Sequence, residues 1–264
     1  MDFLEEVYNG IEVDYERDKE IALYRYIPFD ALLEIFAEKA IHLVNTCKWE
    51  DVYENFVLKD RLVTQDNVEY SATGVLKTIY GQSWTGKSSS DALWRIYSPD
   101  RKSVKIKTTI NNLYTVANEA EVKCNANSIL GRVVYYSKKT IEQKILSGEP
   151  YDYEKLIKLV AYSSFIKRKS FSHESEYRLL FIVNSKDDYN SDTIKVPVEP
   201  YSFIKNIHFD PRADKYYVDR CKKILDKLVH FPLDKVHQSN LYTFKPITIH
   251  TCNIKLGCNT LPKE

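Results

Sequence analysis

The chain has 264 residues, of which 44% are hydrophobic and 28% are charged, so it can bury a sizeable core and has the composition of a globular protein. Its 38 basic and 37 acidic side chains leave a net charge of +1, which excludes a strong overall attraction to nucleic acid or anionic lipid. Seven glycines and twenty tyrosines argue against a glycine-rich dinucleotide-binding fold and for aromatic-lined surfaces or a pocket.

The periodicity of apolar residues predicts both strands and helices along the whole chain. In the first half we expect a strand over 21–26, a helix over 30–39, a strand over 41–45, a strand over 75–85, a helix over 88–97 and a strand over 103–110. In the second half we expect a strand ending at 136, helices over 141–148 and 154–167, strands over 176–183, 194–200 and 204–211, and a helix over 216–229. The strands of the second half do not alternate regularly with helices, which favours an α+β fold over a doubly wound sheet.

No repeat or linker marks a domain boundary. We therefore expect a single globular domain over 1–264, with a core of about 21–230 and a C-terminal extension over 231–264. The acidic N-terminus lacks the features of a signal peptide, and no run of about eighteen apolar residues occurs, so we expect a cytoplasmic protein with no membrane partner.

The five cysteines include no CxxC pair, and we expect free thiols. Cys252, Cys258 and His250 do not complete a four-ligand set, so we expect no metal site.

Two glutamates, Glu174 and Glu176, precede and open the strand over 176–183. Carboxylates two residues apart on a strand point to the same face, so at the mouth of a cleft they can act together on one ligand. The alternative is a solvated strand end beside the basic run 167–169.

Arg25 lies between Tyr24 and Tyr26 in an otherwise apolar strand, where burial of an unpaired guanidinium is costly. A structural salt bridge would satisfy it, and so would bidentate binding of a phosphate. Further along, the hydroxyls of Ser83 and Thr85 share one face at the end of a predicted strand.

In chain order these motifs resemble the R-S-E class of ADP-ribosyltransferases, which carry an arginine, a Ser-x-Thr-like strand and Glu-x-Glu. The resemblance implies an α+β fold with a split β-sheet core and flanking helices, and NAD as a substrate. It implies that Arg25 contacts the NAD phosphates or ribose, and that Ser83 steadies the nicotinamide ribose. Glu176 would hold a ribose hydroxyl, with Glu174 on the acceptor side.

We expect Arg25, Ser83 and Glu176 to converge on one cleft. The predicted catalytic residues are Glu176, Glu174 and Arg25, and the predicted NAD-binding residues are Arg25, Tyr26, Ser83, Thr85 and Trp94.

Over roughly residues 23–228 the chain is also similar to the bacterial domain-of-unknown-function family 2971 (DUF2971). The matching segments are LYRYIPFDALLEIF, IHLVN with WEDVYENF, QSWT with LWRIYS, VVYY, FIKRKSFSHESEYRLL and IKVPVEP. This family implies no activity. The likeness to the transferases implies an ADP-ribosyltransferase or NAD glycohydrolase that acts as a bacterial toxin or antiviral defence effector, with a protein or nucleic-acid acceptor and a neutralising or defence-complex partner.

Two alternatives stay open. Residues 81–88, GQSWTGKS, fit the phosphate-binding loop G-x-x-x-x-G-K-[ST], in which Lys87 would reach a nucleotide's phosphates and Asp210 is the best candidate for the metal-binding aspartate. The basic run 167–169, between Phe165 and Phe171, would instead suit a non-catalytic module that binds nucleic acid or protein.

Overall fold

The computed structural model describes residues 3–51, 54, 61–63, 67–71, 77–146, 159–160, 162–183 and 191–248, and the structural statements below refer to these residues. The α-helices are α1 (Phe3–Ile11), α2 (Tyr15–Asp18), α3 (Phe29–Glu38), α6 (Asp91–Tyr97), α7 (Ile110–Cys124), α8 (Lys138–Leu146), α10 (Pro200–Phe203) and α11 (Lys215–Ile224). A π-helical stretch, η3 (Leu225–Val229), continues α11, and three short 3-10 helices are η1 (Thr46–Lys48), η2 (Lys169–Glu174) and η4 (Leu233–Lys235).

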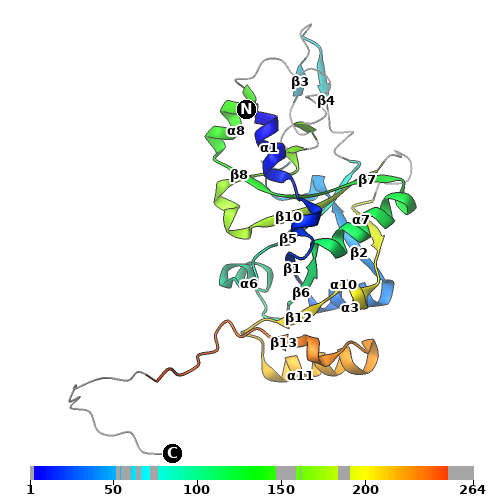
Figure 1. Ribbon diagram of the computed structural model, residues 1–264, viewed down its shortest axis with the longest axis vertical. Helices are drawn as coiled ribbons and strands as arrows, with labels where there is room; N and C mark the ends of the chain where they lie inside the picture. The colour runs from blue at the N-terminus through cyan, green and yellow to red at the C-terminus, as the bar shows by residue number, and fades with distance from the viewer. Residues whose placement is uncertain are drawn as a thin grey trace, which may run out of the picture.

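The strands are β1 (Ala22–Ile27), β2 (Ala40–Asn45), β3 (Arg61–Val63), β4 (Glu69–Ser71), β5 (Ile79–Thr85), β6 (Val104–Thr109), β7 (Ala126–Arg132), β8 (Val134–Tyr136), β9 (Ile166–Arg168), β10 (Glu176–Val183), β11 (Thr193–Pro197), β12 (Asn206–Phe209) and β13 (Val236–Gln238). Nine of them form one mixed sheet, in which all pairs are antiparallel except β12 with β13. Helices flank this sheet, with α7 and α3 on it and α11 beyond β12 and β13 (Figure 1). The α+β class is therefore confirmed.

The sheet divides along one edge of β5. On its other edge β5 pairs continuously with β10, from Ile79 to Thr85. On the divided edge β2 pairs with β5 only at Tyr80 and Gly81, and β1 pairs with it only at Thr85. Since β1 and β2 do not pair with each other, the described strands leave a gap in the sheet, spanned by α3.

The two faces of the sheet have different chemistry. One face carries Leu23, Ile106, Ile207 and Leu179, which belong to the main hydrophobic core beneath α7 and α11. The other face carries a row of polar and aromatic side chains that begins at Glu176. Burial of the apolar face fixes the register, because a one-residue slip would turn every one of its side chains to the opposite face.

Local signals set the helix ends near the polar face. The Ser90 hydroxyl accepts a hydrogen bond from the Leu93 amide and caps α6, and Thr109 caps α7 in the same way. Lys39 ends α3 and Asn125 ends α7 in left-handed conformations, with φ of 51° and 45°.

Several expected elements differ from the structure. The helix α7 was not expected, and the predicted helix over 154–167 is wrong at its end, where Ile166 and Lys167 lie in β9 and pair with β8. Residues 154–158 and 161 of that predicted helix lie outside the described residues. A short helix, α10, begins at Pro200, and β13 adds an edge strand after residue 230.

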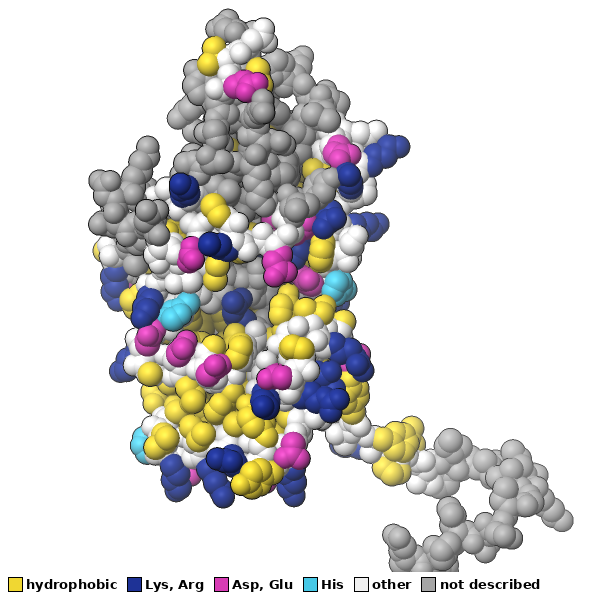
Figure 2. All heavy atoms as spheres, turned by 180° about the vertical axis from the view of Figure 1, so that it is seen from behind, with side chains coloured by type: hydrophobic (Ala, Val, Ile, Leu, Met, Phe, Trp, Pro, Cys, Tyr) yellow, Lys and Arg dark blue, Asp and Glu magenta, His cyan; other side chains and the backbone are white. Residues whose placement is uncertain are grey.

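Neither Cys47 nor Cys221 is in a disulfide, and Cys252, Cys258 and His250 lie outside the described residues. Within the described part of the chain, no helix is both long and apolar enough to cross a bilayer. The face opposite to that in Figure 1 carries basic and acidic side chains interspersed, in keeping with the near-zero net charge (Figure 2).

Candidate active site

A cavity of about 300 Å³ lies where β5 meets β1 and β10, with α6 at its side. This volume is at the lower end of the usual range for small-molecule sites, about 300–1,000 Å³. Its walls include six of the seven predicted site residues, Arg25, Tyr26, Ser83, Thr85, Glu174 and Glu176. The structure thus brings these six residues from three separate segments of the chain to one place.

The seventh predicted residue, Trp94, does not line the cavity. It is fully buried and its indole packs edge-on against Tyr26, with ring centroids 4.7 Å apart. Trp94 therefore supports the wall that Tyr26 forms, because the apolar stripe of α6 turns this indole onto the sheet.

Arg25 is a half-buried cation without a carboxylate partner among the described residues. Its Nη1 donates to the carbonyl oxygen of Ser83, which lies in the gap of the sheet and so lacks a neighbouring strand on that side. Within the described part of the chain no other hydrogen bond of this guanidinium is present, so its remaining donors can bind a ligand. Burial lowers the pKa of Arg25 to about 10, with Tyr97 and Glu176 opposing the shift, so the side chain stays protonated at neutral pH.

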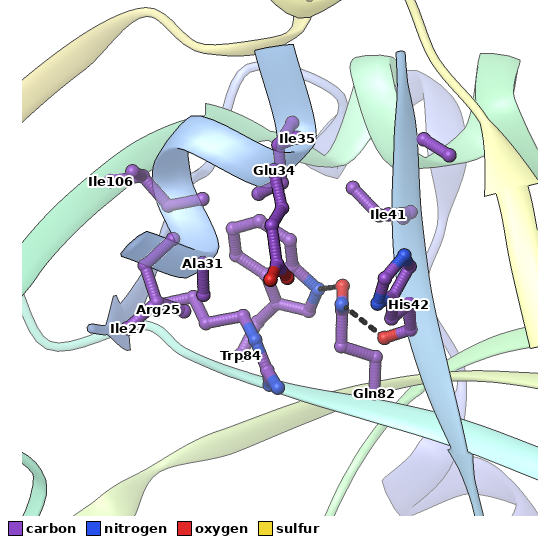
Figure 3. A pocket seen from close by; sticks show the side chains of 11 residues that line it. Arg25, Ile27, Ala31, Glu34, Ile35, Ile41, His42, Gln82, Trp84 and Ile106 are labelled. Carbon is purple, nitrogen blue, oxygen red and sulfur yellow. Dashed lines mark hydrogen bonds between the residues drawn. The ribbon is translucent and has the colours of Figure 1, made fainter. Parts of the chain in front are cut away.

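The gap in the sheet explains how Arg25 reaches the cavity. Strand alternation directs Arg25 to the face opposite Tyr24, yet Arg25, Gln82 and Trp84 line both the cavity and a smaller opening beneath α3. Figure 3 shows this opening, with Glu34 pointing into it beside Trp84 and with Gln82 bound to both Trp84 and the carbonyl of His42. The guanidinium of Arg25 therefore lies in the gap between β1 and β2.

The two glutamates belong to a buried cluster of two cations and three carboxylates. The Nζ of Lys167 lies 2.7 Å from Glu174 and 3.5 Å from Glu54, and it also donates to Glu176. The Nε of Arg178 lies 2.9 Å from the second oxygen of Glu176, and its Nη2 lies 2.5 Å from Glu54. Since Glu174 and Glu176 are only 7% and 6% exposed, the alternative of a solvated strand end is wrong.

This cluster separates the pKa values of the two glutamates. Burial raises the pKa of Glu174 to about 7, helped by its hydrogen bond to Glu176 and opposed by Lys167. Burial acts in the same direction on Glu176, but Arg178, Glu174 and Lys167 together outweigh it and lower the pKa of Glu176. Two carboxylates whose pKa values are pushed apart in this way suit different roles in proton transfer.

Short contacts hold the Glu174–Glu176 turn against the end of β5. The hydroxyl of Thr85 donates to the carbonyl of Glu174, and the amide of Gly86 donates to the carbonyl of Ser175. Ser175 has a left-handed φ of 46°, which lets both glutamates face Lys167 although only Glu176 lies in β10. The role of Thr85 in this arrangement is thus to position the turn.

Sequence reasoning missed four wall and support residues, Trp49, Tyr97, Lys167 and Arg178. Trp49 packs over the guanidinium of Arg178 at 4.3 Å and lines the cavity together with Tyr97. Arg178 carried a usable signal, because it is a charge within the most apolar strand and shares a face with Glu176.

The phosphate-binding loop predicted over 81–88 is wrong. Residues 81–85 are extended strand, paired with β10, and α6 begins only at Asp91. Lys87 is exposed, its amide donates to Thr85, and Asp210 forms an ion pair with Arg212 at 2.7 Å. A phosphate cradle needs free amides at the start of a helix, whereas the amides of Gly86 and Lys87 are already hydrogen-bonded and precede α6.

The basic run 167–169 is not a continuous binding face. Lys167 belongs to the buried cluster, and Arg168 lies 2.9 Å from Asp51 in an ion pair. Of the three residues, only Lys169 is exposed.

The family model for a protein of unknown function (DUF2971) matches residues 93–179. The predicted resemblance to this family is confirmed over that span. The span contains both cavity glutamates with Lys167 and Arg178, and it excludes Arg25 and Ser83. No curated relative matches the sequence.

Three solved structures of DarT from Thermus sp. 2.9 are similar to this chain. The structure in complex with NAD+ has 10% identity and a TM-score of 0.37, and the match covers 84% of this chain and 96% of that one. The structure in complex with ADP-ribosylated ssDNA has 11% identity, a TM-score of 0.36 and coverages of 83% and 94%. The structure with carba-NAD+ has 9% identity, a TM-score of 0.34 and coverages of 84% and 96%. Likenesses this distant do not by themselves establish a shared function.

Proposed function

We propose that the chain is an NAD-consuming enzyme of the ADP-ribosyltransferase type. The observation that carries the proposal is the guanidinium of Arg25, which has no carboxylate partner among the described residues and lies on the same cavity as the ionised Glu176. A cation without a carboxylate partner suits the NAD pyrophosphate, since guanidinium donors match phosphate oxygens. A fixed carboxylate suits the positive charge that develops when the glycosidic bond breaks.

In the proposed reaction the two glutamates have different roles. The bond from ribose C1′ to the nicotinamide nitrogen breaks, and nicotinamide leaves with the electron pair as a neutral molecule. Glu176 stabilises the resulting oxocarbenium-like charge through a ribose hydroxyl. Although Lys167 and Arg178 each take one site on its oxygens, a carboxylate offers about four lone-pair sites, so acceptor capacity remains.

Glu174 is the proposed general base. Its raised pKa, about 7, lies close to neutral pH, where a base combines availability with proton affinity. It would remove the proton from an acceptor nucleophile as that atom bonds to C1′. With water as the acceptor the same steps give an NAD glycohydrolase, and a protein or nucleic-acid acceptor gives a transferase.

The test is release of labelled nicotinamide from NAD, with ATP consumption followed in parallel and cell lysate supplying acceptors. The wild type should release nicotinamide and leave ATP intact. Glu176→Gln should lose about a hundredfold or more in rate, the usual effect of removing one electrostatic partner of the transition state. Lys87→Ala is the matched control and should keep full activity, because Lys87 is exposed and outside the cavity.

Stability has to be followed in the same experiment. Glu176 pairs with both Lys167 and Arg178, so Glu176→Gln removes one partner from buried cations and should lower the melting temperature as well. Rates are therefore compared below the melting transitions of both proteins. Wild-type protein that hydrolyses ATP and spares NAD would contradict the proposal, and one that consumes neither would favour a non-catalytic binding module.

The biological role follows the same proposal. An enzyme that transfers ADP-ribose to a protein or nucleic acid suits a bacterial toxin or antiviral effector, and a neutralising partner would protect its host. Growth arrest on expression of the wild type, and not of Glu176→Gln, would support this role.

A further inference from the structure

A second hollow lies on the polar face of the sheet, beyond Tyr24. It consists of two adjoining spaces of about 280 and 380 Å³. Besides Tyr24, its titratable side chains are Lys105, Lys107, His208 and His237, and no aspartate or glutamate is among the described residues that line it. Ser88 and Asn206 add uncharged polar groups.

Strand register places this hollow on the same face as the candidate active site. Glu176 pairs with Thr85, Thr85 with Tyr24, and Tyr24 with Lys107, so these four side chains share one face. The next row on that face runs from Lys105 through His208 to His237. Tyr24 lines both the cavity and the hollow, which makes the two spaces neighbours.

Lys105 is a buried cation that no described carboxylate neutralises. It is 4% exposed, and its Nζ lies over the rings of Tyr24, Trp94 and Tyr26 at 4.9, 5.9 and 6.0 Å. The ammonium group donates to the carbonyl of Ser88. Aromatic rings and one carbonyl compensate a buried charge only in part, so an anion at this place would be strongly favoured.

His208 supplies a second unsatisfied group. Its Nδ1 is buried and has no hydrogen-bond partner in the described parts of the chain, and its ring lies 5.5 Å from that of His237. Burial lowers the pKa of His208 to about 4, and the charges of Lys105, His237 and Lys107 act in the same direction. At neutral pH the imidazole of His208 is therefore uncharged, and the positive charge of the hollow comes from Lys105 and Lys107.

We propose that Lys105, Lys107, His208 and His237 form a binding subsite for a phosphate group of a ligand other than the NAD pyrophosphate. Resting on the proposed function, the proposal assigns this phosphate to a substrate of the same reaction, because the subsite adjoins the cavity across Tyr24. Several donors from three strands converge there, and a phosphate offers more acceptor oxygens than a carboxylate.

The test measures binding of inorganic phosphate by calorimetry in an Arg25→Gln background, which removes the guanidinium of the main cavity. Lys107→Gln and His237→Asn change a half-buried and an exposed side chain, so both variants should fold. Each should weaken phosphate binding, Lys107→Gln by about tenfold or more because one charge-assisted contact is lost. Lys205→Gln, at an exposed lysine outside the hollow, carries the same charge change and should leave the affinity within about twofold.

Two further titrations identify the source of the phosphate. If Lys107→Gln weakens the binding of NADP more than the binding of NAD, the subsite binds a phosphate on the ADP-ribose donor. If the substitution instead weakens the binding of a single-stranded oligonucleotide, the subsite binds the phosphodiester of an acceptor. Phosphate affinity that is the same in Lys107→Gln, His237→Asn and Lys205→Gln overturns the proposal. Absence of nicotinamide release would contradict the proposed function and leave this phosphate titration intact, so the two failures are distinguishable.

Discussion

Charge balance around the cavity distinguishes its three buried or half-buried basic residues. Lys167 and Arg178 are each compensated by carboxylates, whereas the partner of Arg25 among the described residues is a carbonyl oxygen. A compensated cation contributes to the fold, and removing its partner is costly. An uncompensated cation at a cavity wall contributes little to the fold and is available to a ligand.

Arg25→Gln should therefore weaken NAD binding without harming the fold. We expect the dissociation constant of NAD to rise at least about tenfold, because a charge-assisted phosphate contact is lost. The free energy of unfolding should change by no more than about 1 kcal/mol. Calorimetry and urea unfolding measure the two quantities on the same preparation.

Arg178→Gln provides the contrast. Its guanidinium is 1% exposed and holds Glu54 and Glu176, so the substitution should destabilise the protein by about 3–5 kcal/mol. Equal destabilisation by Arg25→Gln and Arg178→Gln would mean that Arg25 is a structural residue.

Glu174 makes stability depend on pH in a defined direction. Its pKa is raised from 4.5 to about 7, so between these values the folded state binds more protons than the unfolded state. Its contribution to the free energy of unfolding is complete below pH 4.5 and is lost as the pH rises towards 7. Across that window the free energy of unfolding of the wild type should fall, relative to that of Glu174→Gln, by on the order of 1 kcal/mol per pH unit.

Urea unfolding at several pH values within the window gives this difference. Glu119→Gln, at an exposed glutamate, is the control, and its free energy of unfolding should change with pH as that of the wild type does. If the free energy of unfolding of Glu174→Gln also changed with pH as in the wild type, a raised pKa of Glu174 would be excluded.

At the scale of secondary-structure elements, close packing of β5 shapes one wall of the cavity. A Cβ atom on Gly81 would lie 2.6 Å from the ring of Trp49 and 2.7 Å from the Leu180 side chain. Gly81→Ala should therefore displace Trp49 from Arg178 and destabilise the protein by about 1–3 kcal/mol. At Gly86 the nearest contact would be 3.3 Å, to the ring of Tyr177 on an exposed turn.

Gly86→Ala is thus the matched control, with an expected change below about 0.5 kcal/mol. Thermal melting of both variants, together with the fluorescence of the tryptophans, measures the effect. A Gly81→Ala protein as stable as Gly86→Ala would show that Trp49 does not pack on β5 as described.

Elements with a strong period were predictable from the sequence, and those fixed by tertiary contacts were not. β1, β6 and β10 alternate or are continuously apolar, and each lies close to its predicted range. The sequence pattern does not predict α7, because its buried stripe includes the small residues Ala117 and Ala120 among polar neighbours. The pattern predicts helix at β9, because these three residues form a strand only through pairing with β8.

In the candidate site, too, some residues were predictable from the sequence and others depend on tertiary contacts. Arg25 and the two glutamates were found from residue type and spacing, since charges within apolar strands are rare. The sequence could not show that Trp94 lies behind Tyr26, nor that Lys167 turns inward, because both depend on which strands become neighbours.

At the scale of the whole molecule, the incomplete pairing of β5 generates the site. Because β1 and β2 meet β5 at different ends, the sheet opens where Arg25 lies and keeps the carboxylates on the intact edge with β10. The same register continues the polar face to the basic hollow at β12 and β13. One face of the sheet thus carries carboxylates near the cavity and basic side chains near the hollow, with Tyr24 lining both spaces.

The most direct test of this account is a crystal structure with a hydrolysis-resistant NAD analogue. The account predicts the pyrophosphate against the guanidinium of Arg25, and a hydroxyl of the nicotinamide ribose within about 3 Å of a Glu176 oxygen. An analogue bound outside the cavity, or one whose pyrophosphate lies in the basic hollow away from Arg25, would contradict it.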